Sequence, residues 1–199
     1  MSKADGAPGG LCFGSPGDAW PRPHDNCYWL LPGTLLAGQH PCAAWAGQPG
    51  AAAGGVIKAM LDAGIRQWLD LTQAFEHLPD YRTALADSAA QRKLQVQVHR
   101  WPITDYAVPG VARMRAILDT LHAALQAGQP LYLHCHGGIG RTGTVVGCLL
   151  VEHGHTPDQA LALLARKWQV MAKREHAPRS PETDEQRDFI RNWVPGAGR

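Results

Sequence analysis

The chain has 199 residues, and its 19 Lys and Arg against 17 Asp and Glu leave a net charge of +2. This length suits one domain with a sizeable core, and so small a charge indicates neither nucleic acid nor a membrane surface as a partner. Residues 1–14 lack the apolar segment of a signal peptide, and no apolar run is long enough to cross a bilayer. The five cysteines are irregularly spaced and predict no disulfide framework. We therefore expect a reducing, cytoplasmic location.

The first half of the chain alternates short apolar runs with helical patterns. Residues 1–26 are rich in Gly and Pro, which predicts a flexible N-terminal extension before a single domain at 27–199. The apolar patterns predict strands at 28–31, 35–38, 65–71 and 94–101 and helices at 56–63 and 79–91, with a loop at 48–55.

The second half is more strongly helical. A one-sided apolar pattern predicts a helix between Gly110 and Gly128, and a short strand follows at 131–134. Helices are next expected from about Arg141 to Gly154, from the Thr156–Gln159 capping box to about Trp168, and from Ser180 to about Trp193. Strands that alternate with helices predict an α/β fold around a central sheet.

One segment carries candidate chemistry. Residues 134–143, HCHGGIGRTG, lie between a predicted strand and a predicted helix. Their glycines allow backbone angles that turn successive N–H groups inward, which makes an anion-binding nest. The positive end of the following helix points at the same spot. Such a cradle suits a phosphate dianion and favours a thiolate at Cys135.

Two neighbouring side chains complete this site. The planar guanidinium of Arg141 can bind two phosphate oxygens at once. The hydroxyl of Thr142 can donate to the sulfur of Cys135 and stabilise it as a leaving group.

Three other interpretations compete with this one. A lone Cys at a strand end is usually an inert packing residue, but here it is combined with the glycines, Arg141 and Thr142. Residues 138–143 also match a dinucleotide-binding pattern, which requires an acidic residue at the end of a second strand. The candidate, Asp158, follows Pro157 in the first turn of a helix instead. A Walker loop is excluded because no Lys precedes Thr142.

The pattern His-Cys-x5-Arg-Thr resembles the signature of the protein tyrosine phosphatase superfamily, and weaker similarity extends over 28–193. The resemblance implies an α/β fold with a central, mostly parallel sheet flanked by helices, and no metal or other cofactor. It implies that Cys135 attacks phosphorus and forms a cysteinyl-phosphate, with His134 supporting the loop. The residues implied to bind the substrate phosphate are His136, Gly137, Gly138, Ile139, Gly140 and Arg141.

The acid and the hydrolytic water depend on the resemblance. By itself Asp105 could be an ordinary turn residue, but it lies between Pro102 and Pro109, and members of this family carry a mobile general-acid loop upstream of the Cys. The sequence pattern Pro-Ile-x-Asp resembles that of the dual-specificity branch, which includes kinase-associated phosphatase. We expect Asp105 to be the acid, with Glu76 or Asp80 as the alternatives.

In part of the family a Gln positions the hydrolytic water. Gln186 is the candidate for that role here, and a plain surface Gln in a first helical turn is its alternative. Ser180 is expected to cap the last helix rather than take part.

The favoured substrate is phosphotyrosine in a protein, with phosphoserine or phosphothreonine as a further possibility. A small phosphomonoester such as an inositol or nucleotide phosphate remains open, although the absence of Lys between Cys135 and Arg141 weighs against a highly phosphorylated inositide. A phosphate-binding pseudophosphatase is disfavoured because a nucleophile, a phosphate clamp, a hydroxyl and a candidate acid are all present. A rhodanese-type sulfur transferase also competes, but Thr142 and the Asp105 loop favour a phosphatase. No metal-binding motif is found, and the oligomeric state is unknown from the sequence.

Overall fold

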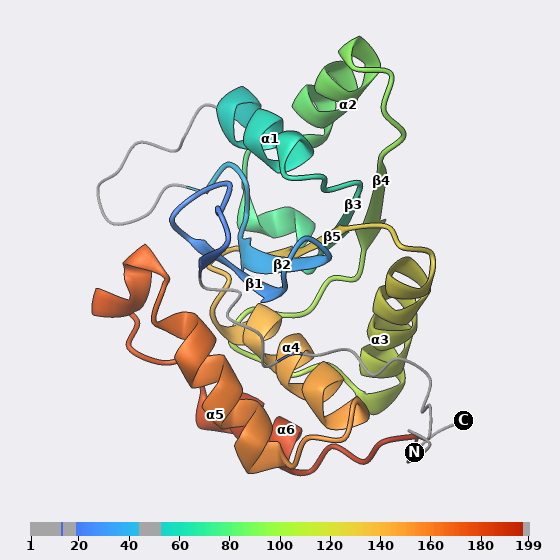
Figure 1. Ribbon diagram of the computed structural model, residues 1–199. Helices are drawn as coiled ribbons and strands as arrows, with labels where there is room; N and C mark the ends of the chain where they lie inside the picture. Colours follow the sequence, from blue (N-terminus) through green and yellow to red (C-terminus); the bar gives the residue numbers. More distant parts are fainter. Residues whose placement is uncertain (1–12, 14–18, 44–52, 197–199) are drawn as a thin grey trace, which may run out of the picture.

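The computed structural model describes residue 13, residues 19–43 and residues 53–196 (Figure 1). Five strands form one sheet in the order β1-β2-β5-β3-β4. Their bounds are β1 (Cys27–Leu31), β2 (Leu35–Gln39), β3 (Gln67–Asp70), β4 (Gln97–Arg100) and β5 (Leu131–Cys135). β1 runs antiparallel to β2, and the other neighbours are parallel. The predicted α/β fold with a mostly parallel central sheet is confirmed.

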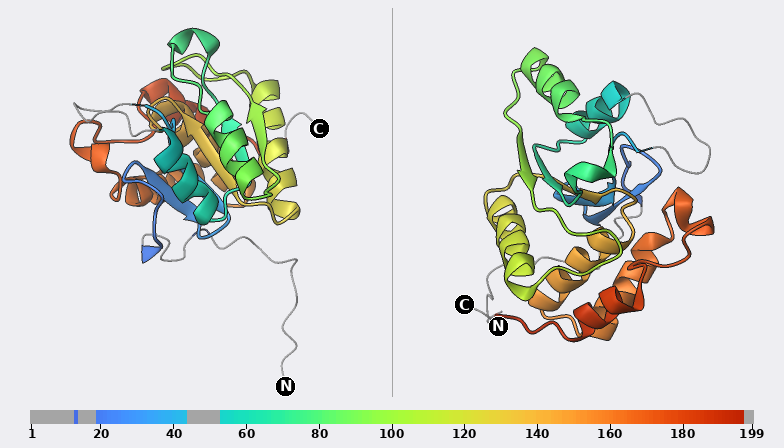
Figure 2. Two further views of the ribbon diagram at one scale, coloured as in Figure 1. Left: turned by 90° about the horizontal axis from the view of Figure 1, so that it is seen from above. Right: turned by 180° about the vertical axis from the view of Figure 1, so that it is seen from behind.

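Helices cover both faces of this sheet. Figures 1 and 2 show α1 (Ala53–Asp62) and α2 (Arg82–Gln91) on one face. The opposite face carries α3 (Val111–Gln126), α4 (Gly140–Glu152), α5 (Pro157–Trp168) and α6 (Asp184–Arg191). Two short 3₁₀ helices, η2 (Ala74–Glu76) and η3 (Ala172–Glu175), lie in the connections. None of the helices in the described residues is long and apolar enough to span a bilayer.

The central strand β5 is buried on both faces. Leu131 and Leu133 belong to the larger apolar core beneath α3 to α6. Tyr132 points the other way, into the smaller core with Ile57 of α1 and Leu85 of α2. A strand covered on both faces has no polar face, which explains why the sequence there is an unbroken apolar run.

Several predicted boundaries differ from the structure. The strands predicted at 65–71 and 94–101 are only four residues each in β3 and β4. α1 begins at Ala53, inside the segment predicted as loop at 48–55, whose residues up to 52 lie outside the described part. The last helix begins at Asp184 and is capped by Thr183, whose side chain accepts from Gln186 N–H. The expectation that Ser180 caps it is therefore wrong.

Part of the predicted N-terminal extension lies against the domain. Trp29 of β1 donates its indole N–H to the carbonyl of Pro21 at 3.0 Å. The imidazole of His24 is 3.1 Å from the hydroxyl of Tyr132 in β5. Of the expected extension at 1–26, the described residues 19–26 are thus tied to the sheet, because β1 and β5 offer them polar side chains as partners.

Candidate active site

The candidate residues meet at one edge of the sheet. β5 lies between β2 and β3, and its last residues pair with the last residues of both neighbours, Cys135 with Gln39 and His134 with Asp70. The loops that follow four strands therefore converge at the carboxyl end of β5. In open α/β sheets this edge is where ligands bind. Cys135 ends β5, and only 2% of its surface is exposed.

Residues outside the loop that follows Cys135 hold it in place by donating hydrogen bonds to its carbonyl groups. Donors bind three of its carbonyl oxygens: His40 N–H that of His136, Lys173 Nζ that of Gly137, and Ser180 Oγ that of Ile139. In a trans peptide the N–H points opposite to the C=O, so the following N–H groups are directed to the inside of the loop. One of them, Gly138 N–H, donates to the sulfur of Cys135 at 3.2 Å.

Two glycines of the loop lie very close to neighbouring residues of β2 and α6. Gly138 has a φ of +73°, and a Cβ there would lie 2.3 Å from the carbonyl carbon of Gly38 in β2. A Cβ at Gly140 would lie 2.7 Å from the amide of Gln186. The backbone of β2 therefore allows only glycine at 138, whereas a side chain at 140 would displace the amide of Gln186.

Arg141 is anchored from two directions. It lies in the first turn of α4, directly after Gly140, and its side chain is 1% exposed. Nη1 and Nη2 donate to the two carboxylate oxygens of Glu76 at 2.5 and 2.9 Å. Nη2 also lies 2.9 Å from Oδ1 of Asp105. Burial disfavours the charged guanidinium, but the Glu76 hydrogen bonds and the nearby negative groups outweigh it, so the pKa of Arg141 lies above its ordinary value.

Two polar atoms in the first turn of α4 remain without a partner. Nε of Arg141 and Oγ1 of Thr142 are buried and make no hydrogen bond to any described residue. The expected donation from Thr142 to Cys135 is therefore not formed in this structure. Because Glu76 takes the Nη1–Nη2 end of the guanidinium, the Nε–Nη2 side is the one that can face an oxyanion. Buried donors without partners are costly, and these two could donate to an anion.

Asp105 lies in the loop that follows β4. The loop is tied to the sheet by hydrogen bonds from Trp101 N–H to Asp70 O and from Ile103 N–H to Leu71 O. The Asp105 side chain is 45% exposed, and its contact with Arg141 brings it to the loop around Cys135. The neighbouring Tyr106 has a φ of +60° and is exposed. A carboxylate at the rim of the site can reach a leaving group, as a general acid must.

Both alternative acids are engaged by arginine side chains. Glu76 is the carboxylate bound to Arg141, and this pairing outweighs the effect of burial, so the pKa of Glu76 lies below its usual value. Asp80 is bound by its neighbour Arg82, whose hydrogen bonds lower the pKa of Asp80 to about 2. Neither group is suited to hold a proton near neutral pH. Sequence reasoning thus missed the role of Glu76, which no local pattern indicates.

The two histidines beside Cys135 differ in their surroundings. His134 is fully buried, and its Nε2 is 2.8 Å from the hydroxyl of Tyr81. Burial lowers the pKa of His134, so its imidazole is neutral. Its expected support of the loop stays a prediction. His136 is half-exposed, and its Nδ1 lies 3.7 Å from the carboxylate of Glu76. His136 therefore lines the loop on its Glu76 side.

Gln186 is buried, so the alternative of a plain surface Gln is wrong. Its Oε1 accepts from the backbone N–H groups of Glu182 and Thr183, and its Nε2 is 3.4 Å from the carbonyl of Ala107. The amide thus links the cap of α6 to the loop that carries Asp105. Because both lone pairs of Oε1 are used, Gln186 can hold a water only through the second N–H of its amide.

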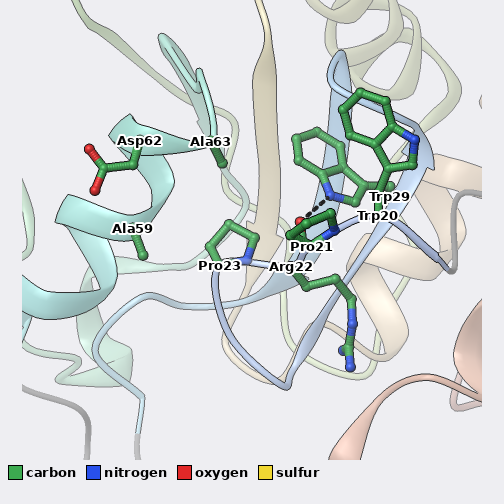
Figure 3. Close-up of a pocket in the computed structure, with 8 residues that line it drawn as sticks. All are labelled: Trp20, Pro21, Arg22, Pro23, Trp29, Ala59, Asp62 and Ala63. Atoms are coloured by element: carbon green, nitrogen blue, oxygen red, sulfur yellow. Dashed lines mark hydrogen bonds between the residues drawn. The ribbon is translucent and has the colours of Figure 1, made fainter.

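A cavity with a mainly apolar lining lies away from this site. This cavity of about 530 Å³ lies between the segment before β1 and helix α1 (Figure 3). Its two charged side chains are bound elsewhere, Arg22 to the carbonyls of Asp25 and Cys27, and Asp62 to Lys58 and Arg92. The cavity holds none of the predicted site residues. Within residues 13, 19–43 and 53–196, no three His, Cys, Asp or Glu side chains are grouped to hold a metal ion.

A thiol at the carboxyl end of a central parallel strand, followed by an anion-binding loop and a helix, defines the protein tyrosine phosphatase fold. A family model confirms this assignment. The chain belongs to the family described as Swiss Army Knife protein, DSP-PTPase phosphatase domain, whose model matches residues 24–190.

Individual relatives are more distant. Cyclin-dependent kinase inhibitor 3 from Sus scrofa is 37% identical over 65 residues, which are 32% of this chain and 31% of that protein. Protein tyrosine phosphatase domain-containing protein 1 from Mus musculus is 31% identical over 122 residues, 56% of this chain and 16% of that protein. The matches thus span less than a third of these curated relatives.

A solved structure shares the fold. Kinase associated phosphatase, with its catalytic site cysteine replaced by serine, has a TM-score of 0.62 at 18% identity, and the match covers 78% of this chain and 83% of that one. The expected resemblance to the dual-specificity and kinase-associated branch is confirmed.

Proposed function

We propose that this protein is a cysteine-dependent phosphatase that hydrolyses phosphotyrosine in proteins, with Cys135 as the nucleophile. The observation that carries the proposal is the pair of partnerless buried donors, Arg141 Nε and Thr142 Oγ1, in the first turn of the helix that follows the Cys135 loop. In that loop the sulfur of Cys135 already accepts the N–H of Gly138. Together with the inward N–H groups of the loop, these donors suit the oxygens of a phosphoryl group.

The chemistry follows in two steps. The sulfur of Cys135 attacks phosphorus, the bond to the ester oxygen breaks, and Asp105 gives its proton to that oxygen. Water then attacks the cysteinyl-phosphate while Asp105 takes up a proton, and the sulfur leaves as a thiolate stabilised by Gly138 N–H and Thr142. Gln186 contributes by holding the Asp105 loop through Ala107 and, through its second N–H, the attacking water.

An aromatic substrate is supported by two exposed rings. Phe75 is 65% exposed and directly precedes Glu76, and Tyr106 is 60% exposed and directly follows Asp105. Since Glu76 and Asp105 both contact Arg141, each ring is next in sequence to a residue of the phosphate site. Exposed aromatic side chains at the rim of a cleft offer stacking surface to a phenyl ring. We therefore favour aryl phosphates over alkyl phosphates.

The test is phosphate release from a panel of phosphopeptides, phosphoinositides and inositol phosphates. We expect release from phosphotyrosine peptides, and a phosphorylated Cys135 peptide in acid-quenched samples analysed by mass spectrometry. Cys135→Ser should release none, because a hydroxyl is a far weaker nucleophile than a thiolate. Release confined to inositol or nucleotide phosphates would refute the substrate. Release by the folded Cys135→Ser protein would refute the mechanism, and binding without turnover by the wild type would indicate a pseudophosphatase.

A further inference from the structure

A buried lysine reaches the loop from outside it. Lys173 lies in η3, and its side chain is 1% exposed. Its ammonium donates to Oε1 of Gln39 at 2.8 Å and to the carbonyl oxygen of Gly137. Gln39 pairs with Cys135 in the sheet, so the ammonium lies between the end of β2 and the loop that follows β5.

The backbone around Lys173 is fixed by the segment that precedes β1. Lys173 N–H donates to the side-chain oxygen of Asn26 at 3.1 Å, and Ala172 N–H donates to the carbonyl of Asp25 at 3.0 Å. These contacts place the lysine independently of its own side chain. Its position against the loop is therefore set by the fold.

The ammonium binds the same peptide group that contacts the nucleophile. The carbonyl oxygen between Gly137 and Gly138 accepts from Lys173, and the N–H of that peptide donates to the sulfur of Cys135. Hydrogen bonds in such a chain polarise one another, so a cation on the oxygen strengthens donation by the N–H. A charged donor also holds the peptide in the orientation that aims its N–H at the sulfur.

We propose that Lys173 is a positioning residue that fixes the Gly137–Gly138 peptide and, through it, stabilises negative charge on the sulfur of Cys135. The inference rests on the proposed role of Cys135 as nucleophile and adds a residue to it. Lys173 needs no contact with the substrate for this role.

The charges around the loop explain the need for a second cation. Arg141 is paired with two carboxylates, Glu76 and Asp105, which leaves these three groups with one negative charge. A charged Lys173 adds a positive charge beside the loop. Two other titratable side chains face the sulfur of Cys135, His134 and Tyr28, and both are neutral. The ammonium of Lys173 is faced by Glu182 and His24. Burial lowers the pKa of Lys173 to about 8, against the opposing effect of Cys135 and Glu182, so the amine is still mostly charged near neutral pH.

The test is the pH dependence of Cys135 alkylation by iodoacetamide, followed by mass spectrometry of the peptide that contains it. Lys173→Met removes the charge while keeping a long side chain. We expect its alkylation profile to move upward by about one pH unit, which is about a tenfold slower reaction on the acidic side. Lys173→Arg should stay near the wild type, as should Lys167→Met, which removes a buried lysine of α5.

A second neutral variant tests the inference independently if Lys173→Met fails to fold. Lys173→Gln should shift the profile in the same direction, because it also lacks the charge. A wild-type profile in either folded neutral variant would overturn the inference, even if the variant melted at a lower temperature. Alkylation needs no turnover. A wild type that shows the expected profile but releases no phosphate would therefore refute the proposed function and not this inference.

Discussion

Replacing Glu76 by Gln removes the negative charge of this residue and keeps the size of its side chain. The Glu76 carboxylate is 8% exposed and binds the end of the Arg141 guanidinium through both oxygens. A Gln of the same size can accept one of these bonds but brings no negative charge. The buried guanidinium would keep only Asp105, a half-exposed partner, for its charge.

The expected cost follows from that loss. Removing one partner of a buried ion pair typically costs 3–5 kcal/mol, and we expect about 3 kcal/mol here because Asp105 still offsets part of the charge. For a chain of this length, that corresponds to a drop in Tm of about 6–12 °C. Since the folded-state pKa of Glu76 is lowered, its contribution is present above the ordinary carboxyl range and is lost as the pH falls through it. The difference between variant and wild type should therefore shrink in acid.

The assay is thermal unfolding at neutral pH, with and without inorganic phosphate. Phosphate should raise the Tm of Glu76→Gln more than that of the wild type, because the anion supplies the missing negative charge to Arg141. Asp105→Asn is the matched control on the same guanidinium, and its exposed carboxylate should cost less than about 1 kcal/mol. A Glu76→Gln protein that melts within about 2 °C of the wild type would refute the reasoning.

Three further outcomes are expected. Asp105→Asn should slow a phosphotyrosine peptide by about 10²–10⁴-fold and an activated nitrophenyl phosphate far less, because only the poor leaving group needs a proton; equal slowing of both would assign the acid elsewhere. Phe75→Ala and Tyr106→Ala should raise KM for phosphotyrosine peptides and leave phosphoserine peptides unchanged, with the exposed ring of Trp20 as the control for substitution to Ala. His40 is held neutral by burial, with a pKa of about 3 against an ordinary 6.5, so its contribution to stability is present above 6.5 and is lost toward lower pH. Thermal unfolding should show wild-type stability falling by about 1.4 kcal/mol per pH unit for this group below 6.5, and a His40→Asn protein that falls as steeply would contradict this.

The elements that the sequence predicts best are those with a one-sided pattern and a cap. α3 and α5 match their predicted ranges because their apolar faces and the Thr156 capping box are local signals. The sequence predicts the start of the last helix too early because Ser180-Pro181 resembles a helix start. The Ser180 hydroxyl instead binds the carbonyl of Ile139, a contact between residues far apart in the chain. Only the assembled fold brings that carbonyl within reach.

The same distinction divides the site. Cys135, Arg141 and Thr142 lie in one short segment whose residue types predict an anion-binding loop, and Asp105 comes from a resemblance over its own short loop. Glu76 and Lys173 reach the loop from η2 and η3, and neither belongs to a pattern with a known spacing. Their contribution depends on the position of the side-chain end group in the folded protein. Sequence periodicity does not determine that position.

Two carboxylates bind the guanidinium of Arg141, and a phosphate would share one of its atoms with them. Glu76 binds the Nη1–Nη2 end, which fixes the plane of Arg141. Asp105 shares Nη2, the atom that a phosphate bound along Nε and Nη2 would also use. A dianion arriving on that side would compete with the Asp105 carboxylate for Nη2 and repel it, which would free the side chain of Asp105 from Arg141. Binding of the substrate phosphate would thus itself release Asp105 for its role as the acid, while Glu76, on the opposite end, keeps the clamp in place.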